Sequence, residues 1–142
     1  MNAKFIIAVV VIFVAWMLGD FVVHAVLLKP EYMKLAGLFR TESESGAYMP
    51  FMLLAHVLLA LALVWVYAKG REAKPWLSQG LRYGFAISLL ATTPTYLIYY
   101  AISPYPGDVV VTQIVSETIL CLILGTIVAF IYREPAPATA AA

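Results

Sequence analysis

Four long apolar stretches, separated by short polar segments, constrain the fold of this chain more than any other feature. They cover residues 5–28, 48–68, 81–102 and 109–132, and each has about the 20 residues that a helix needs to cross a bilayer. Inside hydrocarbon, every backbone N–H and C=O group must find its partner within the protein, which a helix achieves by itself. The sequence therefore predicts an all-α integral membrane four-helix bundle.

The composition agrees with a membrane protein whose main partner is the lipid bilayer. The chain has 142 residues, of which 63% are hydrophobic and 12% charged, whereas a soluble domain is about 45–50% apolar and 25% charged. A net charge of +1 argues against a nucleic-acid partner, which requires a concentrated basic patch. The single cysteine, Cys121, allows no intrachain disulfide and no CxxC motif. We expect one domain over residues 1–133 and a disordered cytoplasmic tail over 134–142.

The segment between the first two spans, residues 30–46, is polar with spaced apolar side chains. It predicts a short amphipathic helix at the membrane interface, followed by a flexible link over residues 41–46. A solvated loop with anchoring aromatic residues is the alternative, and Arg40 could fold back over the mouth of the bundle. The first span is longer than the roughly 7–15 apolar residues of a signal peptide, so we read it as a permanent helix.

Basic residues predict the orientation of the four spans. One side of the membrane receives six of the nine: Lys4, Lys69, Arg71, Lys74, Arg82 and Arg133. The opposite side receives Lys29, Lys34 and Arg40, which are mixed with glutamates. The positive-inside rule then places both termini in the cytoplasm.

Ionisable residues within the spans fall at one level. Asp20 and His24 are four residues apart in the first span and share a helix face. At 1.5 Å per residue, Asp20, His24, His56 and Glu117 all lie roughly 8 to 13 Å from the outer ends of their spans. Such residues are rare in membrane helices and usually face partners or a wet cavity. We expect these four to converge, with Trp16, Tyr96, Gln113 and Arg40 bordering them.

Several functions fit two carboxylates and two imidazoles in one layer. They could bind a divalent metal such as Zn, Mn or Fe, relay or bind protons, or, with His24 and His56 as axial ligands, hold a haem b. A purely structural polar cluster is a further interpretation. Another is an accessory subunit or homo-oligomer, packed through small residues against a larger membrane complex. We do not expect an enzyme, because Ser116 and Glu117 are sequence neighbours and do not face each other.

The third span combines small residues with an internal proline. Gly80, Gly84 and Ser88 recur every four residues, the spacing that allows close helix approach in lipid. Pro94 removes one helical hydrogen bond and predicts a kink. Neighbouring threonine hydroxyls can bind the carbonyls that such a kink exposes; they are Thr92, Thr93 and Thr95.

The chain resembles a family of small bacterial inner-membrane proteins with four helices, a domain of unknown function. Five features carry the resemblance: Asp20 and His24 followed by Leu27-Leu28, Tyr32, Arg40, Tyr67-Ala68-Lys69-Gly70, and Gly80-Leu81-Arg82-Tyr83-Gly84. The likeness covers most of the chain except the tail. It implies the four-span fold and brings no activity.

Overall fold

The computed structural model describes residues 3–35 and 37–134, and these are helical along almost their whole length. No strand occurs in these two ranges. Four helical rods are long and apolar enough to cross a membrane, namely Ala3–Leu27, Ser43–Gly70, Trp76–Ile102 and Gly107–Tyr132. The predicted all-α bundle is thereby confirmed. Of the predicted tail over 134–142, residues 135–142 lie outside the described residues.

The first and third rods each contain a π-helical segment. Rod one consists of α1 (Ala3–Asp20) and the π-helical η1 (Phe21–Leu27), and the short α2 (Lys29–Lys34) follows it. Rod two is α3 (Glu42–Gly70). Rod three consists of α4 (Trp76–Ile87), the π-helical η2 (Ser88–Thr92) and α5 (Thr93–Ile102), and rod four is α6 (Gly107–Tyr132).

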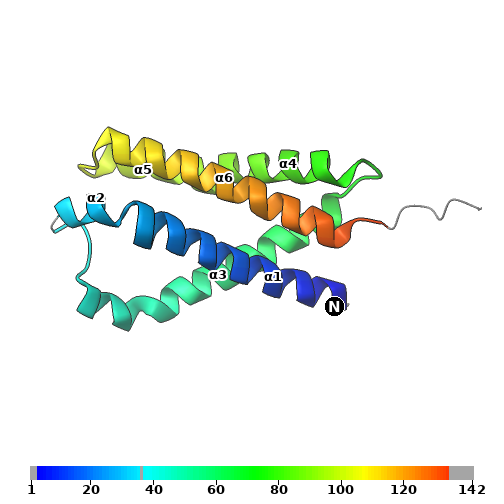
Figure 1. The fold of residues 1–142 in the computed structure, drawn as a ribbon, viewed down its shortest axis with the longest axis horizontal. Coiled ribbons are helices and arrows are strands. Elements are labelled where there is room, and N and C mark those ends of the chain that lie inside the picture. Colours follow the sequence, from blue (N-terminus) through cyan, green and yellow to red (C-terminus); the bar gives the residue numbers. More distant parts are fainter. Residues whose placement is uncertain (1–2, 36, 135–142) are drawn as a thin grey trace, which may run out of the picture.

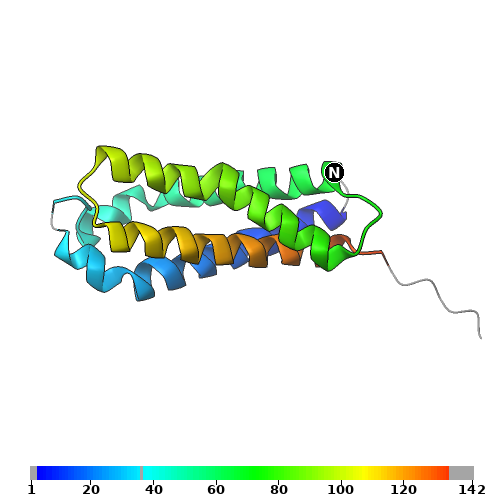
Figure 2. The same cartoon turned by 90° about the horizontal axis from the view of Figure 1, so that it is seen from above.

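The rods run up and down in sequence order. Helix α1 packs on α3 and α6, and α4 makes its most extensive contact with α6. The start of α1, the α3–α4 connection and the end of α6 lie at one end of the molecule, which we call the terminal end (Figure 1). Helix α2 and the α5–α6 turn lie at the other, the α2 end, as the view turned by 90° also shows (Figure 2).

Glycines bring α4 and α6 into close contact. A methyl group added at Gly80 would lie 2.7 Å from the Gly125 carbonyl oxygen, and one at Gly84 would collide with the Cys121 carbonyl. The small face that the sequence predicts is therefore used for packing within the chain. It is not an open surface against which a larger complex could pack.

An apolar core fills the half of the bundle towards the terminal end. Trp16 belongs to this core, although the sequence suggested that it borders the polar residues. Its other members come from α1, α3 and α6 and include Ala8, Ile12, Ala60, Leu63, Val64, Tyr67, Leu120, Leu124, Val128, Ala129 and Tyr132. Many large apolar side chains also face outwards, which is the surface that a lipid-embedded bundle requires.

The predicted flexible link over residues 41–46 is wrong, because α3 begins at Glu42 instead of residue 48. Thr41 caps the helix: its hydroxyl accepts a hydrogen bond from the Glu44 N–H at 3.4 Å, and the Glu44 carboxylate accepts one from the Thr41 N–H at 3.0 Å. This reciprocal capping box satisfies donors that would otherwise be free. The predicted interfacial helix corresponds to α2, which is six residues long.

The predicted irregularity near Pro94 takes the form of the π-helical η2 immediately before it. The Thr92 hydroxyl donates to the Ser88 carbonyl at 3.0 Å, and the Thr95 hydroxyl donates to the Ala91 carbonyl at 2.7 Å. Side chains thus bind carbonyl groups where the regular ladder is interrupted.

Candidate functional site: a polar layer of two carboxylates and two histidines

Asp20 and His56 form the first of two acid–imidazole pairs. Asp20 ends α1 and His56 lies in the middle of α3, so the contact between these helices brings them together. His56 Nε2 lies 2.8 Å from Asp20 Oδ2, and its Nδ1 lies 2.8 Å from the Met52 carbonyl oxygen. The imidazole is buried, with 5% of its surface exposed.

The position of a proton follows from these two contacts. A carbonyl oxygen only accepts, so His56 Nδ1 must carry a hydrogen. Its Nε2 then needs a second proton to bond with the Asp20 carboxylate, unless that carboxyl is itself protonated. In either case one proton lies between Asp20 and His56, and the pair is neutral as a whole.

His24 and Glu117 form the second pair. His24 lies in the π-helical η1 and Glu117 in α6; π-helical segments are frequent at functional sites. His24 Nε2 lies 3.2 Å from Glu117 Oε1, and the Glu117 side chain is only 4% exposed. An acid buried in this way requires a proton, a hydrogen-bond donor or a cation beside it.

Tyr32 in α2 supports His24 from its other side. The Tyr32 hydroxyl lies 2.7 Å from His24 Nδ1 and accepts a hydrogen bond from Gln113 Nε2 at 2.9 Å. Burial raises the pKa of Tyr32 above its ordinary value of 10.0, so the hydroxyl keeps its proton at neutral pH. Because this proton can rotate, Tyr32 can donate to Nδ1 or accept from it. Both neutral tautomers of His24 are therefore accommodated.

The two pairs meet around a common point. One ligand atom each from Asp20, His24 and Glu117 lies within 4.8 Å of the other two. Asp20 Oδ1, which is buried, has no hydrogen-bond partner in the described part of the chain. A buried carboxylate oxygen without a donor is costly, and a cation at this point would satisfy it. We call Asp20, His24, His56 and Glu117 the polar layer.

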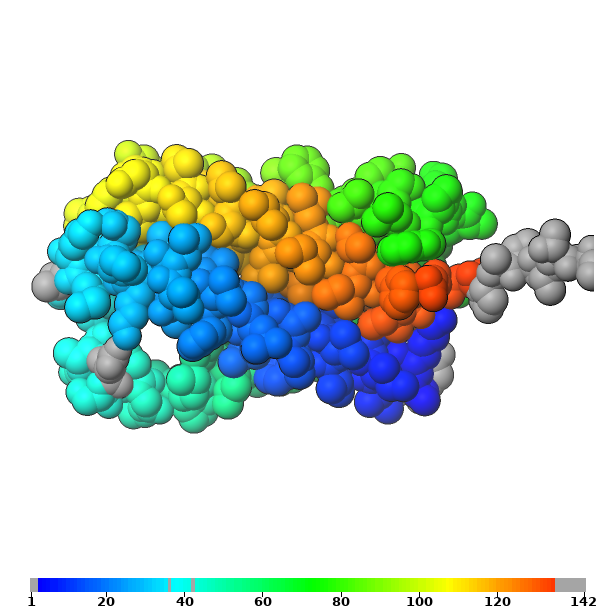
Figure 3. All heavy atoms as spheres, viewed as in Figure 1, coloured from blue at the N-terminus to red at the C-terminus, as the bar shows by residue number. Residues whose placement is uncertain are grey.

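A cavity of about 1050 Å³ opens between the polar layer and the connection that contains α2. His24, Tyr96, Gln113 and Arg40 line it, and the Tyr96 hydroxyl is 3.4 Å from His24 Nε2. The space-filling view shows the molecule hollowed between this connection and the first turns of α3 (Figure 3). The structure thus brings the four layer residues together, with Tyr96 and Gln113 beside them.

Two of the four residues that were predicted to border the layer, Arg40 and Trp16, have their main contacts elsewhere. Arg40 lines the cavity, but its guanidinium lies over the Tyr48 ring at 3.6 Å and does not reach the layer. Trp16 lies in the apolar core. Tyr32 was not predicted as a site residue. The available signal was its position eight residues after His24, because two helical turns bring a residue back to a similar side of the helix. The chain stays nearly helical from η1 into α2.

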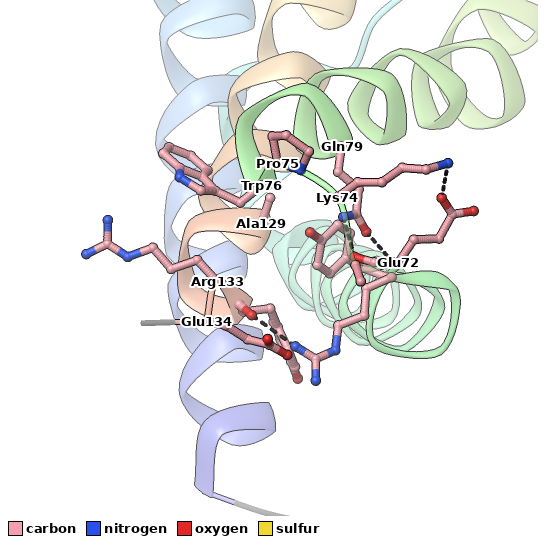
Figure 4. Close-up of a pocket in the computed structure, with 12 residues that line it drawn as sticks. Glu72, Lys74, Pro75, Trp76, Gln79, Ala129, Arg133 and Glu134 are labelled. Carbon is pink, nitrogen blue, oxygen red and sulfur yellow. Dashed lines mark hydrogen bonds and ion pairs between the residues drawn. The ribbon is translucent and has the colours of Figure 1, made fainter. Parts of the chain in front are cut away.

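A second pocket, of about 580 Å³, lies at the terminal end. Three of its charged side chains already have partners: Glu72 is paired with Lys74, and Arg71 donates to the Tyr132 carbonyl at 3.0 Å. Gln79 binds the backbone of Glu72. The Arg133 side chain points away from the Glu72–Lys74 pair (Figure 4). These contacts join the α3–α4 connection to α6, which is a structural role.

Comparison of the chain with protein-family models, with curated proteins and with solved structures finds no match. The polar layer is therefore interpreted from its own chemistry.

Proposed function

We propose that this chain binds a divalent transition-metal cation at Asp20, His24 and Glu117. The observation that carries the proposal is the convergence of three ligand atoms within 4.8 Å of one another. One of the three residues, His24, also lines the open cavity. Imidazole and carboxylate together suit zinc, manganese or iron. Three protein ligands leave coordination positions for water or a bound solute, as in open metal sites.

Charge and outer contacts also favour a cation. The Asp20–His56 pair is neutral as a whole, so an ionised Glu117 leaves the polar layer with one negative charge, which attracts a cation. Ligands in metal sites are usually oriented by a second hydrogen bond. Tyr32 provides it for His24, and His56 provides it for Asp20 while leaving Asp20 Oδ1 available.

The proposed setting is a bacterial inner membrane, with both termini in the cytoplasm and the cavity opening to the outer side. The basic residues at the terminal end support this orientation by the positive-inside rule. The apolar core separates the layer from the terminal end, so the ion would enter and leave from the outer side.

Metal binding can be measured on purified, metal-free protein in detergent by calorimetry with Zn²⁺ and Mn²⁺. We expect one ion per chain. Asp20→Asn, His24→Gln and Glu117→Gln should each weaken binding at least about 10–100-fold, because changes around metal ligands have effects of this size. Asp108→Asn is the matched control, since that carboxylate binds the Val109 N–H outside the layer. Stoichiometric binding that survives all three ligand changes would overturn the proposal, as would no binding to the native chain.

Affinity should fall as the pH is lowered from about 7 to 5. His24 must be deprotonated to bind a metal, and protons compete for both carboxylates. Calorimetry at several pH values would test this expectation. An affinity that is independent of pH contradicts the participation of His24.

Proton binding without a metal is the second candidate, and the proton between His56 and Asp20 favours it. Infrared spectra would separate the two. Proton binding is supported if the protein binds neither metal and shows a protonated-carboxyl band that Asp20→Asn removes. The haem alternative has less support, because His24 and His56 each direct Nε2 at a different carboxylate.

A further inference from the structure

The cavity at the α2 end is larger than a metal ion needs. Its volume of about 1050 Å³ is at the upper limit of small-molecule sites, which are typically about 300–1,000 Å³. Most of its wall is apolar or aromatic: Met33, Leu35, Phe39, Met52, Tyr96, Tyr99, Tyr105 and Val110. Such a wall fits the body of an organic molecule.

Two basic residues line the cavity. Lys29 and Arg40 are among its described lining residues, which include no aspartate or glutamate. Both cations come from the connection at the α2 end, whereas part of the apolar wall, such as Met52 and Tyr99, comes from α3 and α5. A basic group beside an apolar wall matches an amphiphile with an anionic head.

The cavity also lies between α3 and α5, which have no extensive contact with each other. Met52 on α3 and Tyr96 and Tyr99 on α5 contribute to its wall. Helix α3 packs on α1 and α6, whereas α5 packs on α6. A chain-like molecule in the membrane could therefore enter sideways between α3 and α5.

We propose that this cavity binds a long-chain amphiphile with an anionic carboxylate head, its head at Arg40 and its chain against Met52 and Tyr99. The inference goes beyond metal binding and does not depend on it. His24 is the one residue of the polar layer that lines the cavity, so the chain would lie over the entrance to the layer.

Tryptophan quenching by 9,10-dibromostearate tests this proposal. The reporter is Met52→Trp, which places an indole in the cavity wall, and the native protein with its three tryptophans is the blank. The matched control is Leu53→Trp, an exposed neighbour on the same helix that does not line the cavity. We expect saturable quenching of the Met52→Trp indole that unbrominated stearate reverses. The Leu53→Trp indole should show only gradual quenching by partition into the detergent.

Two comparisons test the anionic head. Arg40→Gln should raise the half-quenching concentration about tenfold, whereas Arg133→Gln at the terminal end should leave it unchanged. The methyl ester of dibromostearate should quench the Met52→Trp indole no more than the control indole. Equal quenching of the two indoles by the acid would overturn the proposal, and so would equal saturable binding of acid and ester. Metal binding is tested separately, by titrating the native protein with Zn²⁺ and using Asp20→Asn as the reference. The amphiphile proposal and the metal proposal can therefore fail independently.

Discussion

At the scale of single residues, the polar layer depends on hydrogen bonds that reach it from outside. His24 is held by the Tyr32 hydroxyl, and Asp20 by His56, which in turn is fixed by the Met52 carbonyl. The Met52 carbonyl requires a hydrogen on His56 Nδ1, whereas the Tyr32 hydroxyl accommodates either neutral tautomer of His24. These contacts also decide that Asp20 Oδ1 is the oxygen that stays without a donor.

Tyr32→Phe should weaken Zn²⁺ binding about 10–100-fold, the usual effect of losing an outer hydrogen bond to a ligand. The change removes the partner of both His24 Nδ1 and Gln113 Nε2 and leaves the ring. Tyr105→Phe is the control, because Tyr105 lines the same cavity but packs on Phe39, with ring centroids 5.9 Å apart. Calorimetry on both variants makes the comparison, and equal affinities would contradict the role given to Tyr32.

At the scale of the elements, small residues and caps fix how the rods begin and how closely they pack. The α4–α6 contact has no room for a methyl group at Gly84. The first turn of α3 is held by the Thr41–Glu44 capping box. Both features lead to predictions that are independent of any ligand.

Gly84→Ala should lower the stability of the bundle by about 1–3 kcal/mol, the usual cost of overpacking. The added carbon would meet the Cys121 backbone, which cannot move aside as a side chain can. Gly46→Ala is the matched control, because it lies in a helix with nothing within 4 Å. That change should be neutral or stabilising by up to about 1 kcal/mol, since alanine is the better helix former. Thermal unfolding in detergent measures both, and an unaffected Gly84→Ala protein would show that α4 and α6 are not packed in this way.

Thr41→Ala should fray the first turn of α3, at a cost of about 1 kcal/mol. The hydroxyl that accepts from the Glu44 N–H would be lost, and the turn would open towards the cavity mouth. Hydrogen exchange would show faster exchange of the amides at 43–46, with the middle of α3 unchanged. Ser78→Ala, which removes an exposed hydroxyl that donates to the Pro75 carbonyl, provides the comparison. Unchanged exchange at 43–46 would indicate that the box contributes nothing.

At the scale of the whole molecule, the two ends of the bundle differ in chemistry. The α2 end holds the cavity and the polar layer, and the terminal end holds the apolar core and the paired charges of the α3–α4 connection. Lys74 lowers the pKa of Glu72 in that connection. This contact therefore stabilises the fold above the ordinary pKa of a glutamate and is lost as the pH falls through the lowered value.

Cysteines at the two ends should report opposite sides of the membrane. In intact cells, a membrane-impermeant maleimide should label Lys34→Cys and should label Lys74→Cys only after the cells are opened. Cys121 is buried, so the native chain is the blank. Labelling of Lys74→Cys in intact cells would reverse the proposed orientation and place the cavity on the cytoplasmic side.

The sequence by itself determined the four helical spans and the common depth of Asp20, His24, His56 and Glu117. Both follow from one-dimensional regularities: the apolar length needed to cross hydrocarbon and a constant rise per residue. The four-residue spacing of Asp20 and His24 was also readable, because it depends only on the helical repeat.

Only the tertiary structure decided which acid meets which imidazole, and it joined Asp20 to His56 and His24 to Glu117. These contacts cross between helices, so they depend on the packing of α1 on α3 and of η1 on α6, which no spacing along one helix specifies. The same reason explains Tyr32 and Trp16. The return of α2 over the bundle brought Tyr32 to His24, whereas the rotation of α1 turned Trp16 into the apolar core.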